Sequence, residues 1–485
     1  MPGSIPHEDS FYFIRAGTLC SRTPVTCPPE TSVVELARLM QRHNITGVIV
    51  VDRELPQGVV TLRDLRNLVA TAPESLLQRS VADIMHPGLI TIREQDYLFK
   101  AIFTMAKHRI HRLVVTDDSG TITGLLTNTD LLRIQTRCPL YLSQEIETCE
   151  SFEQLRGIGG RMTEMLQYAI STGADPHSLI SLIAHFNDEL TMRVIALLDL
   201  LEGVRLPEGA AFLALGSDGR GEQTLRTDQD SALVYVDDLP PERMPQMERF
   251  ASRLVASLEY LGVPRCPGNT MATNPQWRHS LSEWKVLLNG WISTPLPDNM
   301  VNFGMFQDMR VIHGDCALQQ ELREHVIAVS HQTALFFPYM ARNIVRFKPP
   351  LGMFGQIKTD SEGEHKGTFD LKKGGIFTLT LGVSLLALEQ GIMGGNTWEK
   401  IERLRQQGKL AASDLDAAED AFSFLLNLRL RRQFAAMKEG RKPDNRIDPL
   451  QLSKREREQL KQAFKGVNQI IQLLKGHFQL DLIRT

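Results

Sequence analysis

The sequence predicts an α+β protein of several domains, and three features of the chain lead to this prediction. An internal repeat, a glycine-rich turn between two apolar runs, and long stretches with helical periodicity follow one another along the chain. At 485 residues the chain has room for roughly three domains. We therefore expect an N-terminal extension at 1–17, a repeat pair at 18–134, a helical connector at 135–206, a mixed-sheet domain at 207–330 and a helical domain at 331–485.

The composition is that of an ordinary globular protein. A net charge of −3, with 42% hydrophobic and 23% charged residues, gives no electrostatic reason to expect a nucleic acid or a membrane as partner. The six cysteines form no C-x-x-C pair, which argues against a zinc site or a disulfide framework. The polar start of the chain is unlike a signal peptide, and the most apolar run, Ile376–Leu388, is too short to span a bilayer. We expect a cytoplasmic protein with a core helix at that run.

The repeat consists of two copies with the pattern strand–helix–strand–strand–helix. The predicted helices are Ser32–His43 and Tyr97–His108. Each copy closes with glycine, two apolar residues, threonine and, three positions later, aspartate. The two threonines and the two aspartates are offset equally, since 127 − 61 = 66 and 130 − 64 = 66. One copy alone buries little core, so the two are expected to pack together.

These repeated strings resemble a tandem pair of CBS domains, a regulatory module that in many proteins binds adenosine nucleotides between its copies. The resemblance implies that a regulatory nucleotide contacts Thr61, Asp64, Thr127 and Asp130. Such a threonine can cap a helix whose N-terminus favours phosphate, and the aspartate can accept hydrogen bonds from ribose. The alternative is that these residues only cap their helices and that the pair mediates dimerisation. We expect a homodimer.

The connector is predicted from a 3.6-residue apolar period in Ile180–Leu201, interrupted upstream by the glycines of 157–160. It is suited to transmitting a signal or to dimerisation.

The segment Ala211–Val236 carries the predicted chemistry. Its apolar ends, Ala211–Leu215 and Ser231–Val236, are expected to be buried strands. Asp228 and Asp230 are two residues apart, so both carboxylates should point to one face of the second strand. A hard divalent cation, Mg²⁺ or Mn²⁺, relieves their repulsion and takes substrate phosphates as further ligands.

The turn between these strands is predicted to bind phosphate. Its glycines allow a sharp bend that presents backbone N–H groups to an anion. The candidate substrate-binding residues are Gly216, Ser217, Gly219 and Arg220.

The string GSDGRGEQTLRTDQD resembles the polymerase-β-like nucleotidyltransferase superfamily. It is similar to the catalytic domain of bacterial PII uridylyltransferases, and more so to the nucleotidyltransferases that occur together with CBS domains. The resemblance implies transfer of UMP or AMP from a nucleoside triphosphate to an acceptor hydroxyl, such as a tyrosine of a PII-like signalling protein. Gln229, where the superfamily has an apolar residue, is expected to point away from the aspartates. The alternative is a catalytically inactive nucleotide-sensing scaffold, against which the intact aspartate pair argues.

The superfamily normally uses a third catalytic carboxylate. We expect Asp308 to supply it, with Glu283 as the weaker candidate and an Asp308–Arg310 ion pair as the structural alternative. The string Phe369–Ile376 resembles a region after the uridylyltransferase core, where Lys372 and Lys373 either reach the triphosphate or solvate the surface. A basic cluster is expected to be a solvated face and consists of Arg429, Arg431, Arg432, Arg441 and Lys442.

Overall fold

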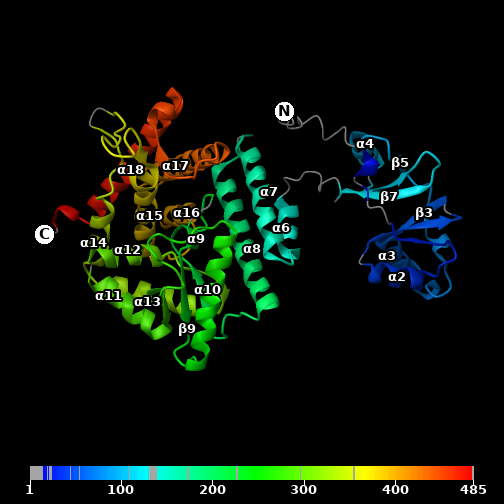
Figure 1. Cartoon of the computed structure of the whole chain (residues 1–485), viewed down its shortest axis with the longest axis horizontal. Coiled ribbons are helices and arrows are strands. Elements are labelled where there is room, and N and C mark those ends of the chain that lie inside the picture. Colours follow the sequence, from blue (N-terminus) through cyan, green and yellow to red (C-terminus); the bar gives the residue numbers. More distant parts are fainter. Residues whose placement is uncertain are drawn as a thin grey trace. The chain divides into compact units, whose positions relative to one another are not determined.

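The structure is a computed structural model in which contacts between residues divide the chain into two compact units, Met1–Tyr141 and Leu142–Thr485 (Figure 1). It describes residues 15–18, 20, 24–43, 45–53, 55–108, 110–128, 130, 139–171, 174–225, 228–294, 296–352 and 355–482. The extension predicted at 1–17 lies almost entirely outside these residues, as does the beginning of the predicted connector. Mixed sheets and helical segments together confirm the α+β multidomain class.

The first unit contains two similar sheets. The first sheet has the order β1 (Thr26–Cys27), β2 (Gly47–Asp52), β3 (Leu55–Thr61), β4 (His86–Pro87), and it is accompanied by α2 (Val33–Arg42) and α3 (Leu62–Thr71). The second has the order β5 (Thr91–Arg93), β6 (Arg112–Thr116), β7 (Ile122–Thr127), with α4 (Leu98–His108). In both, a parallel strand pair is followed by an antiparallel pair with one irregularity in its register. The predicted repeat is therefore present in the backbone.

The second unit is built on a mixed sheet. Its order is β10 (Arg278–Ser280), β9 (Ser231–Tyr235), β8 (Ala210–Ala214), β11 (Arg310–Gly314). β8 and β9 are antiparallel, with Ala214 opposite Ser231, so the end of the first apolar run lies beside the start of the second. The short helix α9 (Gly216–Gly219) follows β8 directly. The glycine-rich turn and the aspartate pair are thereby placed at the same end of the sheet.

Helices surround this sheet and form the rest of the unit. They are α6 (Pro139–Thr148), α7 (Phe152–Ser171), α8 (Pro176–Glu202), α10 (Met244–Tyr260), α11 (Leu281–Ser293), α12 (Pro297–Phe306), α13 (Cys316–Gln332), α14 (Phe336–Ile344), α15 (Phe377–Glu389), α16 (Thr397–Gln407), α17 (Ala412–Lys438) and α18 (Lys454–His477). A small sheet of β12 (Phe369–Asp370) and β13 (Arg446–Ile447) lies next to the π-helix η6 (Lys372–Ile376).

Two predictions about the helices are decided by this packing. The apolar stripe of the predicted connector packs inside the second unit, where α8 contacts α7, α10, β11 and α17. The glycines of 157–160 do not interrupt the chain, because α7 continues through them. The run Ile376–Leu388 forms most of α15, whose residues Thr378–Leu388 are all buried, as expected of a core helix. No helix in the described ranges is long and apolar enough to cross a membrane.

Candidate active site

The glycine-rich turn lies against the aspartate segment. The N–H of Leu215 donates to the carbonyl of Asp230 at 2.9 Å. Gly216 has φ of 54°, and a Cβ at this position would lie 2.9 Å from Cε of Met305 and 3.3 Å from Oδ2 of Asp230. Only glycine fits this backbone conformation and this spacing without strain. The sequence therefore uses glycine here to bring the turn against the carboxylates.

Asp228 and Asp230 form a site suited to a cation. One ligand atom from each of them, together with Sγ of Cys266, lie within 4.8 Å of one another. Burial, and after it the charge of Asp228, raise the pKa of Asp230 to about 6. Oδ1 of Asp230 is buried without a hydrogen-bond partner in the described part of the chain. Two crowded carboxylates with an unused oxygen fit a hard divalent cation.

Cys266 was not predicted from the sequence, because its spacing from other cysteines gives no signal. Burial and the neighbouring Asp230 raise the pKa of its thiol to about 11, so it stays protonated.

Gln229 lies between the aspartates, and its side-chain amide donates to the carbonyls of Val255 and Val263 at 3.2 and 2.9 Å. Its amide nitrogen is thus bound to the end of α10 and the loop that follows.

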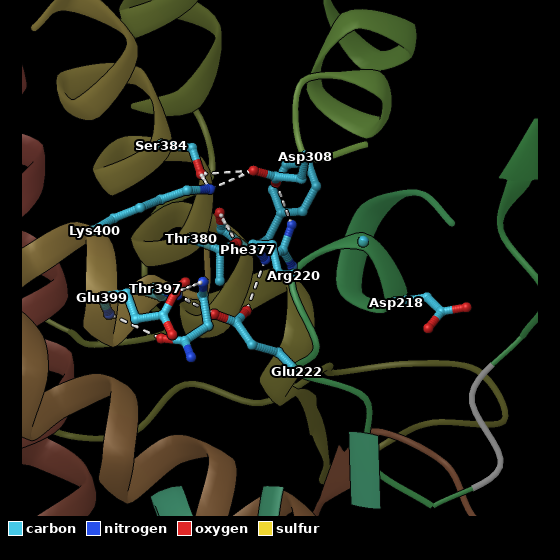
Figure 2. A network of polar contacts seen from close by, with 12 residues as sticks. Asp218, Arg220, Glu222, Asp308, Phe377, Thr380, Ser384, Thr397, Glu399 and Lys400 are labelled. Carbon is cyan, nitrogen blue, oxygen red and sulfur yellow. Dashed lines mark hydrogen bonds and ion pairs between the residues drawn. The ribbon is translucent and has the colours of Figure 1, made fainter. Parts of the chain in front are cut away.

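Asp308, the predicted third carboxylate, belongs to a buried ion-pair network (Figure 2). Only 1% of its side chain is exposed; Oδ2 accepts from Nη1 of Arg220 at 2.6 Å, and Oδ1 accepts from Lys400 and Ser384. Arg220 also donates to Glu222 at 2.7 Å. Burial alone would raise the pKa of Asp308, but Lys400 and Arg220 together lower it. Both oxygens hold cations in place, so Asp308 has structural contacts, and its catalytic role stays a prediction.

Two predicted substrate-binding residues are already engaged within the protein. The guanidinium of Arg220 is bound by two carboxylates, and the N–H of Gly219 donates to the carbonyl of Leu215 at 3.0 Å. Substrate binding by these two residues stays a prediction, as it does for Gly216 and Ser217. The weaker candidate Glu283 caps α11, since its carboxylate accepts from the N–H of Ser280 at 2.8 Å.

Arg310 does not pair with Asp308. It donates to both carboxylate oxygens of Asp188, on α8, at 2.7 and 2.9 Å, and to the carbonyls of Asp218 and Gly219 at 2.9 and 3.2 Å. Burial raises the pKa of Asp218 to about 7 against the effect of Arg310. Arg310 therefore links the glycine-rich turn to Asp188 on α8. The sequence gave no reason to expect this contact.

Two cations from the C-terminal helices act on the aspartate pair. Arg429, on α17, is only 6% exposed; its Nε donates to Oδ1 of Asn445 at 2.7 Å, and no carboxylate within the described ranges forms an ion pair with it. Burial lowers its pKa to about 10, opposed by the charges of Asp228 and Asp370. Burial also lowers the pKa of Lys372, and both Asp228 and Asp230 oppose that shift.

The expectation that Arg429 is part of a solvated basic face is therefore wrong. Its neighbour Arg431 does fit that expectation, being half exposed and paired with Glu456 at 3.1 Å. A weak signal was present in the sequence, because Arg429 stands between Leu428 and Leu430 in a segment rich in leucine. The general rule points the other way, since arginine is rarely buried unless it is paired.

The first unit contains a cavity of about 490 Å³ lined by both repeat copies. Thr61 and Asp64 line it, together with His86 and Arg112. Oδ2 of Asp64 accepts from the N–H and Oγ1 of Thr61 at 2.8 and 2.6 Å, and Oδ1 lies 2.9 Å from His86 Nε2. Thr127 and Asp130 make the same contacts at 2.8 and 2.6 Å. The first pair caps α3, as the structural alternative expected, and also faces a cavity; the helix predicted after Thr127 lies largely outside the described residues.

Family models match three parts of the chain. The model "CBS domain" matches residues 16–71 and 81–137. "Putative nucleotidyltransferase DUF294" matches residues 160–298, and "Putative nucleotidyltransferase substrate binding domain" matches residues 334–478.

Curated relatives resemble only part of the chain. An uncharacterized protein of Methanopyrus kandleri is 28% identical over 135 residues, which cover 28% of this chain and 69% of that protein. One of Methanocaldococcus jannaschii is 30% identical over 25% of this chain and 39% of its own length. The inosine-5′-monophosphate dehydrogenase of Chlorobaculum parvum is 32% identical over 24% of each chain. The chain thus spans well under two thirds of the last two relatives.

Among solved structures, a CBS domain protein from Pyrobaculum aerophilum complexed with AMP is 27% identical over 24% of this chain and 89% of that one, with a TM-score of 0.23. A CBS domain pair in complex with 5′-methylthioadenosine and S-adenosyl-L-methionine is 24% identical over 25% and 95%, with a TM-score of 0.23.

The repeat pair, the mixed sheet with its aspartate pair and the helical C-terminal region together define a nucleotidyltransferase that carries CBS domains. Within that class the second unit matches the models of the putative nucleotidyltransferase DUF294 and of its substrate-binding domain in consecutive segments.

Proposed function

We propose that the protein transfers UMP or AMP from a nucleoside triphosphate to an acceptor hydroxyl on a PII-like signalling protein, with Mg²⁺ or Mn²⁺ as cofactor. The observation that carries this proposal is the Asp228–Asp230 pair, in which one buried oxygen is unused while Lys372 and Arg429 act on the pair from another part of the unit. A divalent cation held there binds triphosphate oxygens and stabilises the charge that develops during transfer.

Each residue has a separate task in this proposal. Asp228 and Asp230 hold the cation, and the turn at Gly216 and Ser217 places the phosphates beside them. Lys372 and Arg429 neutralise the β- and γ-phosphates, which explains a half-buried and a buried cation without carboxylate ion pairs in the described part of the unit. The direct test incubates the protein with each labelled nucleoside triphosphate, Mg²⁺ or Mn²⁺ and a cell extract, and searches for a labelled protein. A labelled PII-like protein is the expected product.

Replacing Arg429 by glutamine should raise the KM for the nucleoside triphosphate about tenfold to a hundredfold, the value of one charge-assisted hydrogen bond. The fold should not suffer, because burial disfavours the charged guanidinium and lowers its pKa. Steady-state kinetics and thermal melts measure the two effects. Arg431→Gln, on the same helix but half exposed, is the control. Equal KM values in both variants would contradict the phosphate-binding role.

The cavity of the first unit supports a regulatory site for an adenosine nucleotide. Four of its lining residues are basic and one is acidic. The basic ones are Arg63, His86, His111 and Arg112, and the acidic one is Asp64. A ligand with phosphate groups complements this excess of basic groups. We propose that nucleotide binding here regulates the transferase, in a homodimer. The same cavity is what favours the alternative function, a nucleotide-sensing scaffold without catalysis, and loss of all transfer activity in the labelling test would select it.

Adenosine nucleotides should raise the melting temperature of the protein by mass action, and Asp64→Ala combined with Asp130→Ala should abolish that shift. These substitutions also remove helix caps, so the shift on adding nucleotide, not the melting temperature itself, is the measurement. Asp83→Ala is a matched control, because Asp83 caps Ser80 in the same way but is not part of the cavity wall. A shift that survives the double substitution would place the nucleotide elsewhere.

A further inference from the structure

A second cavity, of about 480 Å³, lies in the second unit next to the aspartate pair. Its walls are α7, α8 and the segment 258–263 at the end of α10, and Asp218 and Asp230 line it. Apolar side chains such as Phe212 and Leu190 alternate with polar ones over the lining. A concave site of this size, lined by apolar side chains and by polar groups that can orient a ligand, is suited to a small molecule.

Three buried polar atoms in this wall have no hydrogen-bond partner among the described residues. They are Oγ1 of Thr224, Oε1 of Gln229 and Oδ1 of Asp230. Nearly all buried polar atoms in folded proteins have a partner, because leaving one without costs free energy. The wall of the cavity therefore contains polar groups that the described residues leave unsatisfied.

The helix wall of the cavity is made of glycine. Gly159 and Gly160 lie inside α7 and line the cavity, and a Cβ at either position would meet nothing within 4 Å. Glycine inside a helix is unfavourable, and here no neighbouring group in the structure requires it. The missing side chains leave open space against the helix backbone on this side of the cavity.

The charges of the lining disfavour phosphate in the part of the cavity away from the aspartate pair. Its acidic residues are Asp218, Asp230 and Glu259, and the guanidinium of its Arg156 lies 4.9 Å from the ring centroid of Tyr260. Lys372 and Arg429 are not part of the lining. An uncharged group with hydrogen-bonding atoms fits this surface, and the phosphates attached to it belong on the basic side of the aspartate pair.

We propose that this cavity binds the nucleoside, base and ribose together, of the nucleoside triphosphate whose phosphates bind at Asp228 and Asp230. The base lies against Gly159, and the ribose hydroxyls donate to carboxylates of the lining, Asp218 among them. The acceptor protein is the less suitable occupant, because its hydroxyl needs an open approach and this cavity has walls of helix on two sides. The inference rests on the proposed transferase function.

Filling the glycine wall tests the proposal. Gly159→Leu projects a side chain into the cavity, while Gly157→Leu, an exposed position of the same helix outside the lining, is the control. Both changes improve helix propensity, so neither should unfold the protein. Equilibrium dialysis with labelled UTP, CTP, GTP and ATP in Mg²⁺ should show affinity reduced about tenfold or more in Gly159→Leu alone. Binding of inorganic tripolyphosphate should be unchanged in both variants.

The outcomes separate this inference from the function on which it rests. The first unit is identical in all three proteins, so nucleotide bound there cancels from the comparison. Unchanged affinity for every nucleoside triphosphate in Gly159→Leu would overturn the inference, and loss of transfer at unchanged affinity would assign the cavity to the acceptor instead. If the wild-type protein binds no nucleoside triphosphate in a metal-dependent way, the proposed function fails first and takes this inference with it.

Discussion

Asp228→Asn and Asp230→Asn are each expected to lower the transfer rate by about a thousandfold or more. A bound divalent cation contributes several kcal/mol to stabilising a phosphoryl-transfer transition state, and each 1.36 kcal/mol corresponds to a factor of ten in rate. Either substitution removes one of the two carboxylates that hold the cation. The measurement is single-turnover transfer of a labelled nucleotide at saturating metal. Full activity in both variants would refute the proposed site.

The control for these variants is Asp238→Asn, an exposed aspartate shortly after β9. It removes the same charge at the opposite end of β9 without touching the pair, so its activity should equal that of the wild type. Loss of activity in all three variants would point to general electrostatics instead of cation binding.

The aspartate pair should also affect stability when no metal is bound. Burial raises the pKa of Asp230 from 3.8 to about 6, so between these values the folded protein keeps a proton that the unfolded chain releases. The unfolding free energy therefore falls as the pH rises through this interval. Asp230→Asn removes that fall, and metal-free melts should show the variant as the more stable protein at neutral pH.

The sequence allowed prediction of those features that depend on neighbours in the chain. The two strands, the turn at Gly216 and the shared face of Asp228 and Asp230 follow from alternation and from glycine in a tight bend. The repeat pair follows from one constant offset. Each of these depends on a stretch of at most a few dozen residues, or on a pattern that occurs twice.

The roles of Arg429, Asp308 and the α7 glycines could not be predicted in this way. Arg429 is buried because α17 packs against η6, and that contact joins distant parts of the sequence. Asp308 binds Lys400 and Arg220, which are 92 and 88 residues away. Glycine inside a sequence usually signals a break, but α7 continues through 157–160 because its other faces pack on the unit. Tertiary contacts decided each of these cases.

Lys400→Met is expected to reduce the free energy of unfolding by about 3 kcal/mol or more, because it leaves a buried carboxylate with one of its two cations removed. Lys400 and Asp308 are 2% and 1% exposed, and Lys400 also donates to Ser384 at 2.8 Å. Pairing lowers the pKa of Asp308, so this stabilisation is present above its ordinary value of 3.8 and is lost as the pH falls through the lowered value. Denaturant unfolding at pH 7 therefore measures the effect in full.

Arg405→Met on the same helix is the matched control for Lys400→Met. Arg405 pairs with Glu402, Asp416 and Glu419 near the surface, where an ion pair contributes at most about 1 kcal/mol. Adding Asp308→Asn to Lys400→Met should recover part of the loss, because the uncompensated charge is gone.

The carbonyl of Asp308 lies 2.1 Å from where a Cβ of Gly219 would be, so a displaced Asp308 also moves the turn that holds Gly216. Lys400→Met should therefore weaken nucleotide binding as well, and a loss of stability no larger than that of Arg405→Met would show that the network of Figure 2 does not fix the turn.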